Sequence, residues 1–169
     1  EAIAQLGKRY SLAVIGIDQL TQYANVYGKS VSEQVLKLVA PRIQAACSDG
    51  QIFRTTGEEL TVLFSGKSAT ETLNTLDTIR KSAETIGLFL RGKDRVWEKP
   101  GGSREAGLRD RALPITLSIG VAETRDDSAT LSLVIKSAYR GLYDAKGLGG
   151  NVVKRGVEAI VPARRSQSG

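Results

Sequence analysis

Two neighbouring carboxylates, Glu58 and Glu59, lie in the stretch RTTGEEL, between two runs of β-forming residues. The runs QIFRTT and ELTVLF flank the dipeptide Thr56-Gly57 and predict a β-hairpin whose turn carries the acidic pair. A third acid, Asp18, ends the apolar run SLAVIGID, which predicts a central strand. Carboxylate oxygens are the ligands that Mg²⁺ prefers. Glu58 and Glu59 therefore either take part in metal or nucleotide chemistry or are solvent-exposed residues of the turn.

The hydrophobic periods predict which elements position these acids. A helix over 19–27 ends at Gly28, and Ser30, with Glu33 three residues later, predicts a second helix that begins with a capping box. The remaining elements are two amphipathic helices and two strands. They are the helices SATETLNTLDTIRKSAETI and SATLSLVIKSAYRGLYDAKGLGG and the strands LPITLSIGVAE and NVVKR. The order β-α-α-β-β-α-β-α-β predicts an α/β or α+β sheet with helices packed against it.

Composition excludes several classes of protein. The 169 residues fit one domain, and no apolar run reaches the length of a membrane span. The chain has no His and one cysteine, Cys47, so a zinc site is not expected. Cys47 lies in an apolar helical stretch and is predicted to be a buried thiol in a reducing compartment, which favours a cytoplasmic location. The chain opens in mid-helix pattern without Met, which suggests a piece of a longer, membrane-attached or soluble protein.

The net charge of +6 is concentrated in two segments. Residues 91–111 hold seven Lys or Arg against four Asp or Glu, and residues 151–169 hold four against one. We expect an exposed basic insertion at about 91–113 and a basic tail or linker at 156–169, with the domain itself over 1–155. Because the rest is neutral, we expect no nucleic-acid partner. The insertion, with Trp97, is either a solvated loop or a site for an acidic partner.

Four motifs in this order resemble the GGDEF domain, the catalytic domain of diguanylate cyclases. TGEEL stands where that family has G-G-D/E-E-F, and GIDQLTQYANVYG resembles D-x-D-x-F-K-x-x-N-D-x-x-G. TLSIGVA is similar to V-S-I-G-V-A, and AYRGLYDAKGLGGN resembles A-D-x-A-L-Y-x-A-K-x-x-G-R-N. The resemblance covers about residues 7–155. It implies a palm-like nucleotide-cyclase fold with a central, mostly antiparallel sheet.

The resemblance also implies a function and a set of site residues. Two such domains meet face to face, each with one GTP and Mg²⁺, and form cyclic di-GMP. On this chain, the catalytic positions are Glu58 and Glu59, and the nucleotide-binding positions include Gly57, Glu33 and Lys146. The metal positions are Glu58, the backbone of Ile17 and, as a weak ligand, Asp18.

Several positions depart from the family's pattern. The first carboxylate of the metal site falls on Gly16, which has no side chain, and Asp18 lies about 6.6 Å further along the strand. Thr56 replaces a glycine of the turn, where a β-branched residue at positive φ would be strained. The base-contacting Asn falls on Ala24, and the Arg of G-R-N falls on Gly150.

The inhibitory R-x-x-D site reads CSDG at 47–50 and is absent. Lys146 itself could be a phosphate ligand or only a charge at the end of a helix. The letters GKS at 28–30 do not form a phosphate-binding loop, because the upstream glycine is missing and a helix precedes them.

Together these departures predict a degenerate GGDEF domain without cyclase activity. Such a domain would act as a regulatory or dimerising module in a larger cyclic di-GMP signalling protein and bind GTP weakly, with Mg²⁺ only if a nucleotide binds. Its partners would be GTP, a second copy and other domains of the same protein. Two alternatives remain: an active diguanylate cyclase with Asp18 as a surrogate ligand, and a protein-interaction module without a nucleotide site.

Overall fold

The computed structural model describes residues 9–88, 113–124 and 130–156. Apart from residue 113, the basic insertion predicted at about 91–113 lies outside these ranges, as does the tail from residue 157 onward. The helices are α1 (Leu20–Tyr27), α2 (Ser30–Ala46), α3 (Ala69–Glu84) and α4 (Leu131–Gly147). The strands are β1 (Tyr10–Ile17), β2 (Gln51–Arg54), β3 (Glu59–Ser65), β4 (Gly87–Leu88), β5 (Leu113–Pro114), β6 (Leu117–Glu123) and β7 (Val153–Arg155).

Five strands form one sheet in the order β2-β3-β1-β6-β7, with β1 at the centre. All neighbours in it are antiparallel except β6 and β7, which are parallel. The predicted mostly antiparallel sheet is therefore confirmed. The short pair β4-β5 forms a second, two-stranded sheet, whereas the run LPITLSIGVAE was expected to be one continuous strand.

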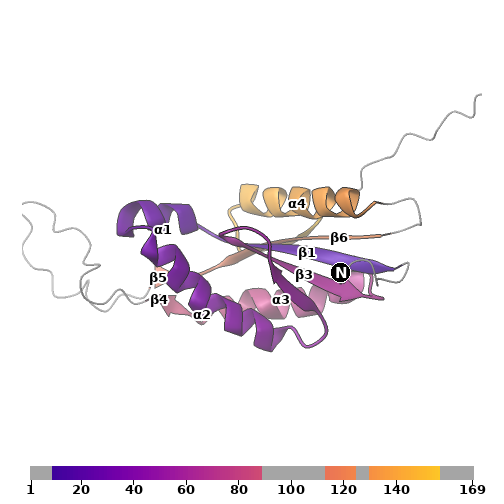
Figure 1. The fold of residues 1–169 in the computed structure, drawn as a ribbon, viewed down its shortest axis with the longest axis horizontal. Coiled ribbons are helices and arrows are strands. Elements are labelled where there is room, and N and C mark those ends of the chain that lie inside the picture. Colours follow the sequence, from indigo (N-terminus) through magenta and orange to yellow (C-terminus); the bar gives the residue numbers. More distant parts are fainter. Residues whose placement is uncertain (1–8, 89–112, 125–129, 157–169) are drawn as a thin grey trace, which may run out of the picture.

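Helix α4 lies on one face of the sheet and helices α2 and α3 lie on the other (Figure 1), and an apolar core lies on each face. Alternate residues of β1 explain the division, because successive side chains of a strand point to opposite faces. Ala13, Ile15 and Ile17 pack with α1, α2 and α3. Leu12 and Val14 pack with α4 instead. The face that carries α4 is also the face on which Gly16 lies.

Helix α4 lies unusually close to the sheet because two glycines face each other. A Cβ built on Gly120 of β6 would lie 2.0 Å from the carbonyl oxygen of Ala138 and 2.1 Å from the amide nitrogen of Leu142. A Cβ on Gly141 would lie 3.1 Å from the Cα of Gly120. No side chain fits between these backbones, so the two glycines set the height of α4, and of Lys146 near its end, above β1.

Helix α2 begins where the sequence predicted, but the predicted capping box does not form there. Helix α2 begins at Ser30, but Lys29 holds the N-cap position and no side chain caps the helix. Glu33 instead pairs with Arg54 of β2. The capping box of this fold lies at α3, where Ser68 accepts from the amide of Glu71 and the Glu71 carboxylate accepts from the amide of Ser68.

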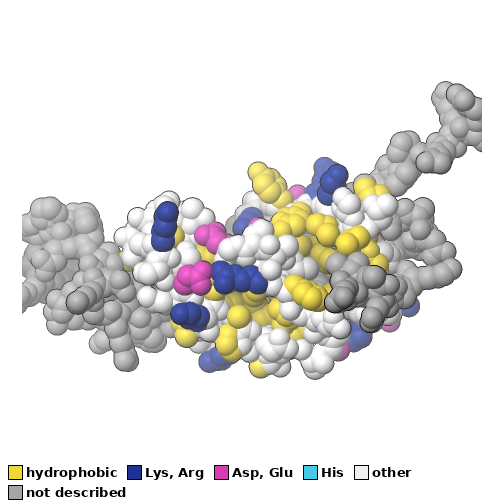
Figure 2. Space-filling view, viewed as in Figure 1, with side chains coloured by type: hydrophobic (Ala, Val, Ile, Leu, Met, Phe, Trp, Pro, Cys, Tyr) yellow, Lys and Arg dark blue, Asp and Glu magenta, His cyan; other side chains and the backbone are white. Residues whose placement is uncertain are grey.

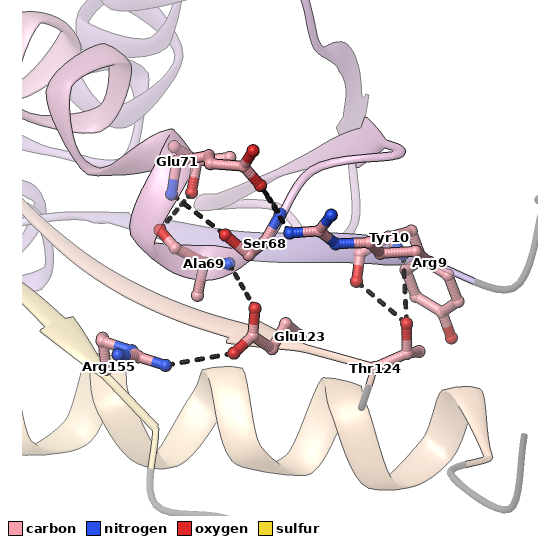
Figure 3. Close-up of polar contacts among 9 residues, drawn as sticks. Arg9, Tyr10, Ser68, Ala69, Glu71, Glu123, Thr124 and Arg155 are labelled. Atoms are coloured by element: carbon pink, nitrogen blue, oxygen red, sulfur yellow. Dashed lines mark hydrogen bonds and ion pairs between the residues drawn. The ribbon is translucent and has the colours of Figure 1, made fainter. Parts of the chain in front are cut away.

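A polar network joins the ends of several elements at the edge of the sheet where β1 begins (Figure 3). Glu71 also accepts a hydrogen bond from Arg9, 2.8 Å away. Glu123, at the end of β6, accepts from the amide of Ala69 and from Arg155 of β7. Hydrogen bonds thus connect Arg9, before β1, and Arg155, in β7, with the start of α3 through Glu71 and Glu123. This network lies about 20 Å from Gly16, six residues along β1.

Charges of both signs are interspersed over the face seen in Figure 2, among the described residues. Large hydrophobic side chains are exposed at single positions on several elements. They are Val26, Leu38, Phe53, Tyr143 and Leu148. Among the described residues, no helix combines the length and the apolar composition that crossing a membrane requires.

Candidate functional site

Three of the predicted site residues, Asp18, Glu59 and Lys146, lie around the end of β1. Gly16 pairs with Glu59 of β3 on one side and with Ser118 of β6 on the other. Directly opposed residues of antiparallel strands place their side chains on the same face. Glu59, the Cα of Gly16 and Ser118 therefore form one row across the sheet, beneath the end of α4. Ile17 is buried on the opposite face, in register with Leu117.

Gly16 leaves a space that Lys146 fills. A Cβ built on Gly16 would lie 2.9 Å from the Cε and 3.0 Å from the Nζ of Lys146, and 3.3 Å from the Cδ1 of Leu142. The ammonium of Lys146 therefore lies directly over the strand, at the position where the family's pattern has a carboxylate. Lys146 is itself exposed to solvent.

Asp18 is engaged by hydrogen bonds with the protein. Its Oδ2 accepts from the Thr116 hydroxyl at 2.8 Å and from the backbone amide of Asn151 at 2.8 Å. Its Oδ1 accepts from the Ser118 hydroxyl at 2.6 Å. These contacts hold the turn between α4 and β7 against β6. Asp18 therefore has a structural role, and its oxygens point toward donors that a divalent cation would have to displace.

Glu59 is also engaged. Its Oε2 accepts from the hydroxyl of Tyr139 on α4 at 2.8 Å and, at 3.4 Å, from the hydroxyl of Thr56. Burial and the neighbouring Glu59 carboxylate raise the pKa of Tyr139 to about 12, so its hydroxyl stays protonated as a donor. The sequence interpretation missed Tyr139. The signal was available, because Tyr139 stands where the motif A-D-x-A-L-Y has its acid.

Glu58 lies exposed in the hairpin turn, and no hydrogen bond or ion pair engages it within the described part of the chain. Both Thr56 and Gly57 have negative φ, so the turn avoids the left-handed conformation in which Thr56 would be strained. A Cβ on Gly57 would meet nothing within 4 Å. The structure therefore imposes no packing requirement for glycine there.

Glu33 lies at the surface beside the hairpin. Arg54 donates to the Glu33 carboxylate at 2.9 Å and to the carbonyl oxygen of Gly57 at 2.8 Å. Arg54 thereby braces the hairpin turn against α2. Ala24, in α1, is only partly buried and has no polar group in its side chain. Of these two positions, which the resemblance places in the nucleotide site, Glu33 is thus in an ion pair and Ala24 is apolar.

This arrangement does not fit a divalent cation. Mg²⁺ requires oxygen ligands in near-octahedral geometry. Among the described residues, no group of three or more His, Cys, Asp or Glu side chains could hold a metal ion. Gly16 supplies no ligand, Lys146 brings a positive charge to the same place, and Asp18 and Glu59 already accept hydrogen bonds.

Comparison with known proteins gives the family. The family model described as "Diguanylate cyclase, GGDEF domain" matches residues 1–96. Diguanylate cyclase VdcA of Vibrio cholerae is 30% identical over 148 residues, which are 87% of this chain and 39% of that protein. Diguanylate cyclase A of Treponema denticola is 26% identical over 144 residues, 85% of this chain and 34% of that protein. The chain thus spans well under half the length of these curated relatives.

Solved structures agree with this match. The GGDEF domain of DgcB from Caulobacter crescentus, solved in complex with c-di-GMP, is 26% identical with a TM-score of 0.70, over 87% of this chain and 77% of that one. The active GGEEF domain of a diguanylate cyclase from Vibrio cholerae has a TM-score of 0.71 at 18% identity, over 90% of this chain and 85% of that one, which shows the fold alone. The predicted palm-like fold is confirmed, and this chain belongs to the GGDEF domain family of diguanylate cyclases.

Proposed function

We propose that this chain is a degenerate GGDEF domain that makes no cyclic di-GMP and acts as a regulatory or dimerising module of a larger cyclic di-GMP signalling protein. The observation that carries the proposal is the placement of the Lys146 ammonium over Gly16. In an active member, two carboxylates and Mg²⁺ would neutralise the phosphates and activate the attacking hydroxyl. Here one carboxylate is lacking, and the Lys146 ammonium lies in its place.

The other acids do not compensate for that loss. To bind a metal, Asp18 would have to give up three hydrogen bonds, and Glu59 would have to leave Tyr139. Each hydrogen bond to a charged group contributes roughly 1.5–3 kcal/mol. Rearranging either acid therefore carries a cost comparable to the charge stabilisation that a metal would supply. Weak GTP binding remains part of the proposal, since Lys146 and Gly57 are retained.

The test is a direct assay for product. The purified chain is incubated with GTP and either Mg²⁺ or Mn²⁺ at protein concentrations that favour dimers, and nucleotides are separated by mass-resolved chromatography. An active GGDEF domain serves as the positive control. We expect no cyclic di-GMP. Product that disappears in Glu58→Ala would refute the proposal.

One observation favours a second candidate, an active diguanylate cyclase. Glu58 is exposed in the turn and engages no other described residue, so it could still bind a metal or a substrate. In that case Asp18 would be the second ligand. Magnesium-dependent product formation that is lost in both Glu58→Ala and Asp18→Asn would establish this candidate in place of the first.

A further inference from the structure

The outer side of helix α4 is exposed, and no other described element covers it (Figure 1). The inner side of the helix packs on the sheet through buried residues such as Val134, Ala138 and Ala145. The opposite side carries exposed residues three or four positions apart, which therefore form one stripe along the helix. This outer stripe of α4 consists of Lys136, Arg140, Tyr143, Asp144 and Gly147.

The charged side chains of the outer stripe have no partner within the described part of the chain. The side chains of Lys136, Arg140 and Asp144 form neither a hydrogen bond nor an ion pair with another described residue. Arg140 and Asp144 are four residues apart, but an acid that follows its base near the end of a helix is in the less favourable order, because the helix dipole is negative at that end. The two charges therefore add little to the stability of α4 itself.

An aromatic side chain lies among these charges. Tyr143 is 81% exposed, more than any other large hydrophobic residue of the described ranges. A Cβ built on Gly147, four residues later, would meet nothing within 4 Å, so space remains beside Tyr143 on the stripe. Tyrosine and arginine are enriched in protein interfaces, and an exposed tyrosine beside charges without described partners indicates a contact surface.

We propose that α4 pairs through its outer stripe with α4 of a second copy, antiparallel and about a two-fold axis. This inference rests on the dimerising role in the proposed function and names the surface for it. Arg140 and Asp144 lie two positions before and after Leu142, so an antiparallel pair centred at that level places Arg140 of each copy opposite Asp144 of the other. Tyr143 lies about 1.5 Å along the helix from the axis, so the two tyrosines pack on each other.

Charge complementarity favours a second copy over a purely acidic or a purely basic partner. An acidic segment would face Asp144 with a like charge, and a basic segment would do the same to Arg140. A second copy pairs both charges, once in each half of the contact. It also brings Lys136, six residues before the centre, toward the last turn of the partner's helix, where a positive charge is favourable.

The geometry of this pair predicts a weak dimer that is unsuited to the family's reaction. Helix α4 has 17 residues and is about 25 Å long, so the contact lies at the low end of the size range of protein interfaces. Both copies of α4 would lie between the two sheets. The ends of β1 could then not meet face to face, as the resemblance implies for two domains that each carry a GTP.

The experiment is sedimentation equilibrium of the 169-residue chain from micromolar to millimolar concentration. We expect a monomer–dimer equilibrium that weakens several-fold in high salt, because the charge pairs are exposed. Arg140→Glu and Asp144→Arg each place like charges opposite one another and should weaken self-association by roughly tenfold or more. Lys37→Glu, which reverses the charge of an exposed residue of α2, is the matched control and should leave the equilibrium unchanged.

A mixture of the two variants tests the antiparallel register directly. In a mixed pair, the acid introduced by Arg140→Glu faces the base introduced by Asp144→Arg, and the two remaining native charges face each other. We expect the mixture to form heterodimers with about the affinity of the unaltered chain. The double variant Arg140→Glu/Asp144→Arg should likewise restore the homodimer. Because the stripe is exposed in the single copy, each variant should keep its circular dichroism spectrum and melting temperature in dilute solution.

Three results would overturn the inference: no self-association at millimolar protein, a dimer that Arg140→Glu leaves intact, or a mixture that associates no better than either variant alone. A chain that stays monomeric and makes no cyclic di-GMP would refute this inference and leave the proposed loss of activity standing. Formation of cyclic di-GMP would refute the proposed function instead, whatever the mixture of variants does.

Discussion

Replacing Asp18 by alanine should destabilise the fold rather than remove a metal site. Asp18 accepts three hydrogen bonds, from Thr116, Ser118 and the amide of Asn151, at 2.6–2.8 Å. Asn151 has a positive φ of 54°, in a turn that also contains Gly149 and Gly150 at positive φ. The variant would remove the hydrogen bond that joins this turn to Asp18, and with it the link through Asp18 to Thr116 and Ser118.

The magnitude follows from the three hydrogen bonds. A hydrogen bond to a charged acceptor contributes roughly 1.5–3 kcal/mol when buried. Asp18 is only partly buried, so we take about 1 kcal/mol for each bond, or about 3 kcal/mol in total. For a chain of this size, that loss lowers the melting temperature by about 6–12 °C. Asp18→Asn retains an acceptor of the same shape, and we expect it to lose only about 1 kcal/mol.

The assay is urea unfolding followed by circular dichroism, in EDTA and again in Mg²⁺. Asp144→Ala, which removes an exposed acid of α4, is the control and should change the free energy of unfolding by less than about 0.5 kcal/mol. If Asp18→Ala lowers stability by no more than the control does, the structural role assigned to Asp18 is wrong. A stabilisation by Mg²⁺ that only the unaltered chain shows would identify Asp18 as a metal ligand instead.

Three further outcomes are expected. Gly120→Ala should lower the free energy of unfolding by about 3 kcal/mol in urea titrations, because its Cβ would lie 2.0 Å from a backbone oxygen of α4; an unchanged midpoint would contradict the close approach. Since the pKa of Tyr139 rises from its usual value near 10 to about 12 on folding, the stability that it contributes is complete below pH 10 and is lost as the pH rises toward 12. The stability difference between the unaltered chain and Tyr139→Phe should therefore shrink over that range, and a difference that stays constant would argue against the contact with Glu59. Burial raises the pKa of Cys47, so a thiol reagent should label it at the rate of unfolding and not faster.

Local sequence patterns predicted most of the fold, because most helices and strands have a clear hydrophobic period or end at a recognisable residue such as glycine. The apolar run of β1 and the glycine after α1 both lie where the sequence indicated, and Gly28 has the positive φ that ends a helix. The capping box was assigned to Ser30 although the same letters, Ser and then Glu three residues later, also occur at Ser68. Only tertiary structure distinguishes the two, because Arg54 draws Glu33 away from the end of its helix.

The site was predicted less completely, since its important contacts join residues far apart in the chain. The substitution at Gly16 was visible in the sequence, but its pairing with Lys146 requires knowing that α4 lies over the end of β1. The contact of Tyr139 with Glu59 spans 80 residues for the same reason. A motif comparison treats such positions one at a time and cannot show that they touch.

These contacts change how the substitutions should be interpreted. Glycine at position 16 removes a metal ligand, yet it also makes room for the Lys146 side chain. Tyr139 likewise donates a hydrogen bond to Glu59. Without this donor, the half-buried Glu59 carboxylate would lose a hydrogen-bond partner. A side chain at position 16 would displace the end of Lys146. A residue without a donor at position 139 would leave Glu59 without this hydrogen bond. These two contacts, of Lys146 with Gly16 and of Tyr139 with Glu59, are the reasons for proposing a regulatory role for this domain.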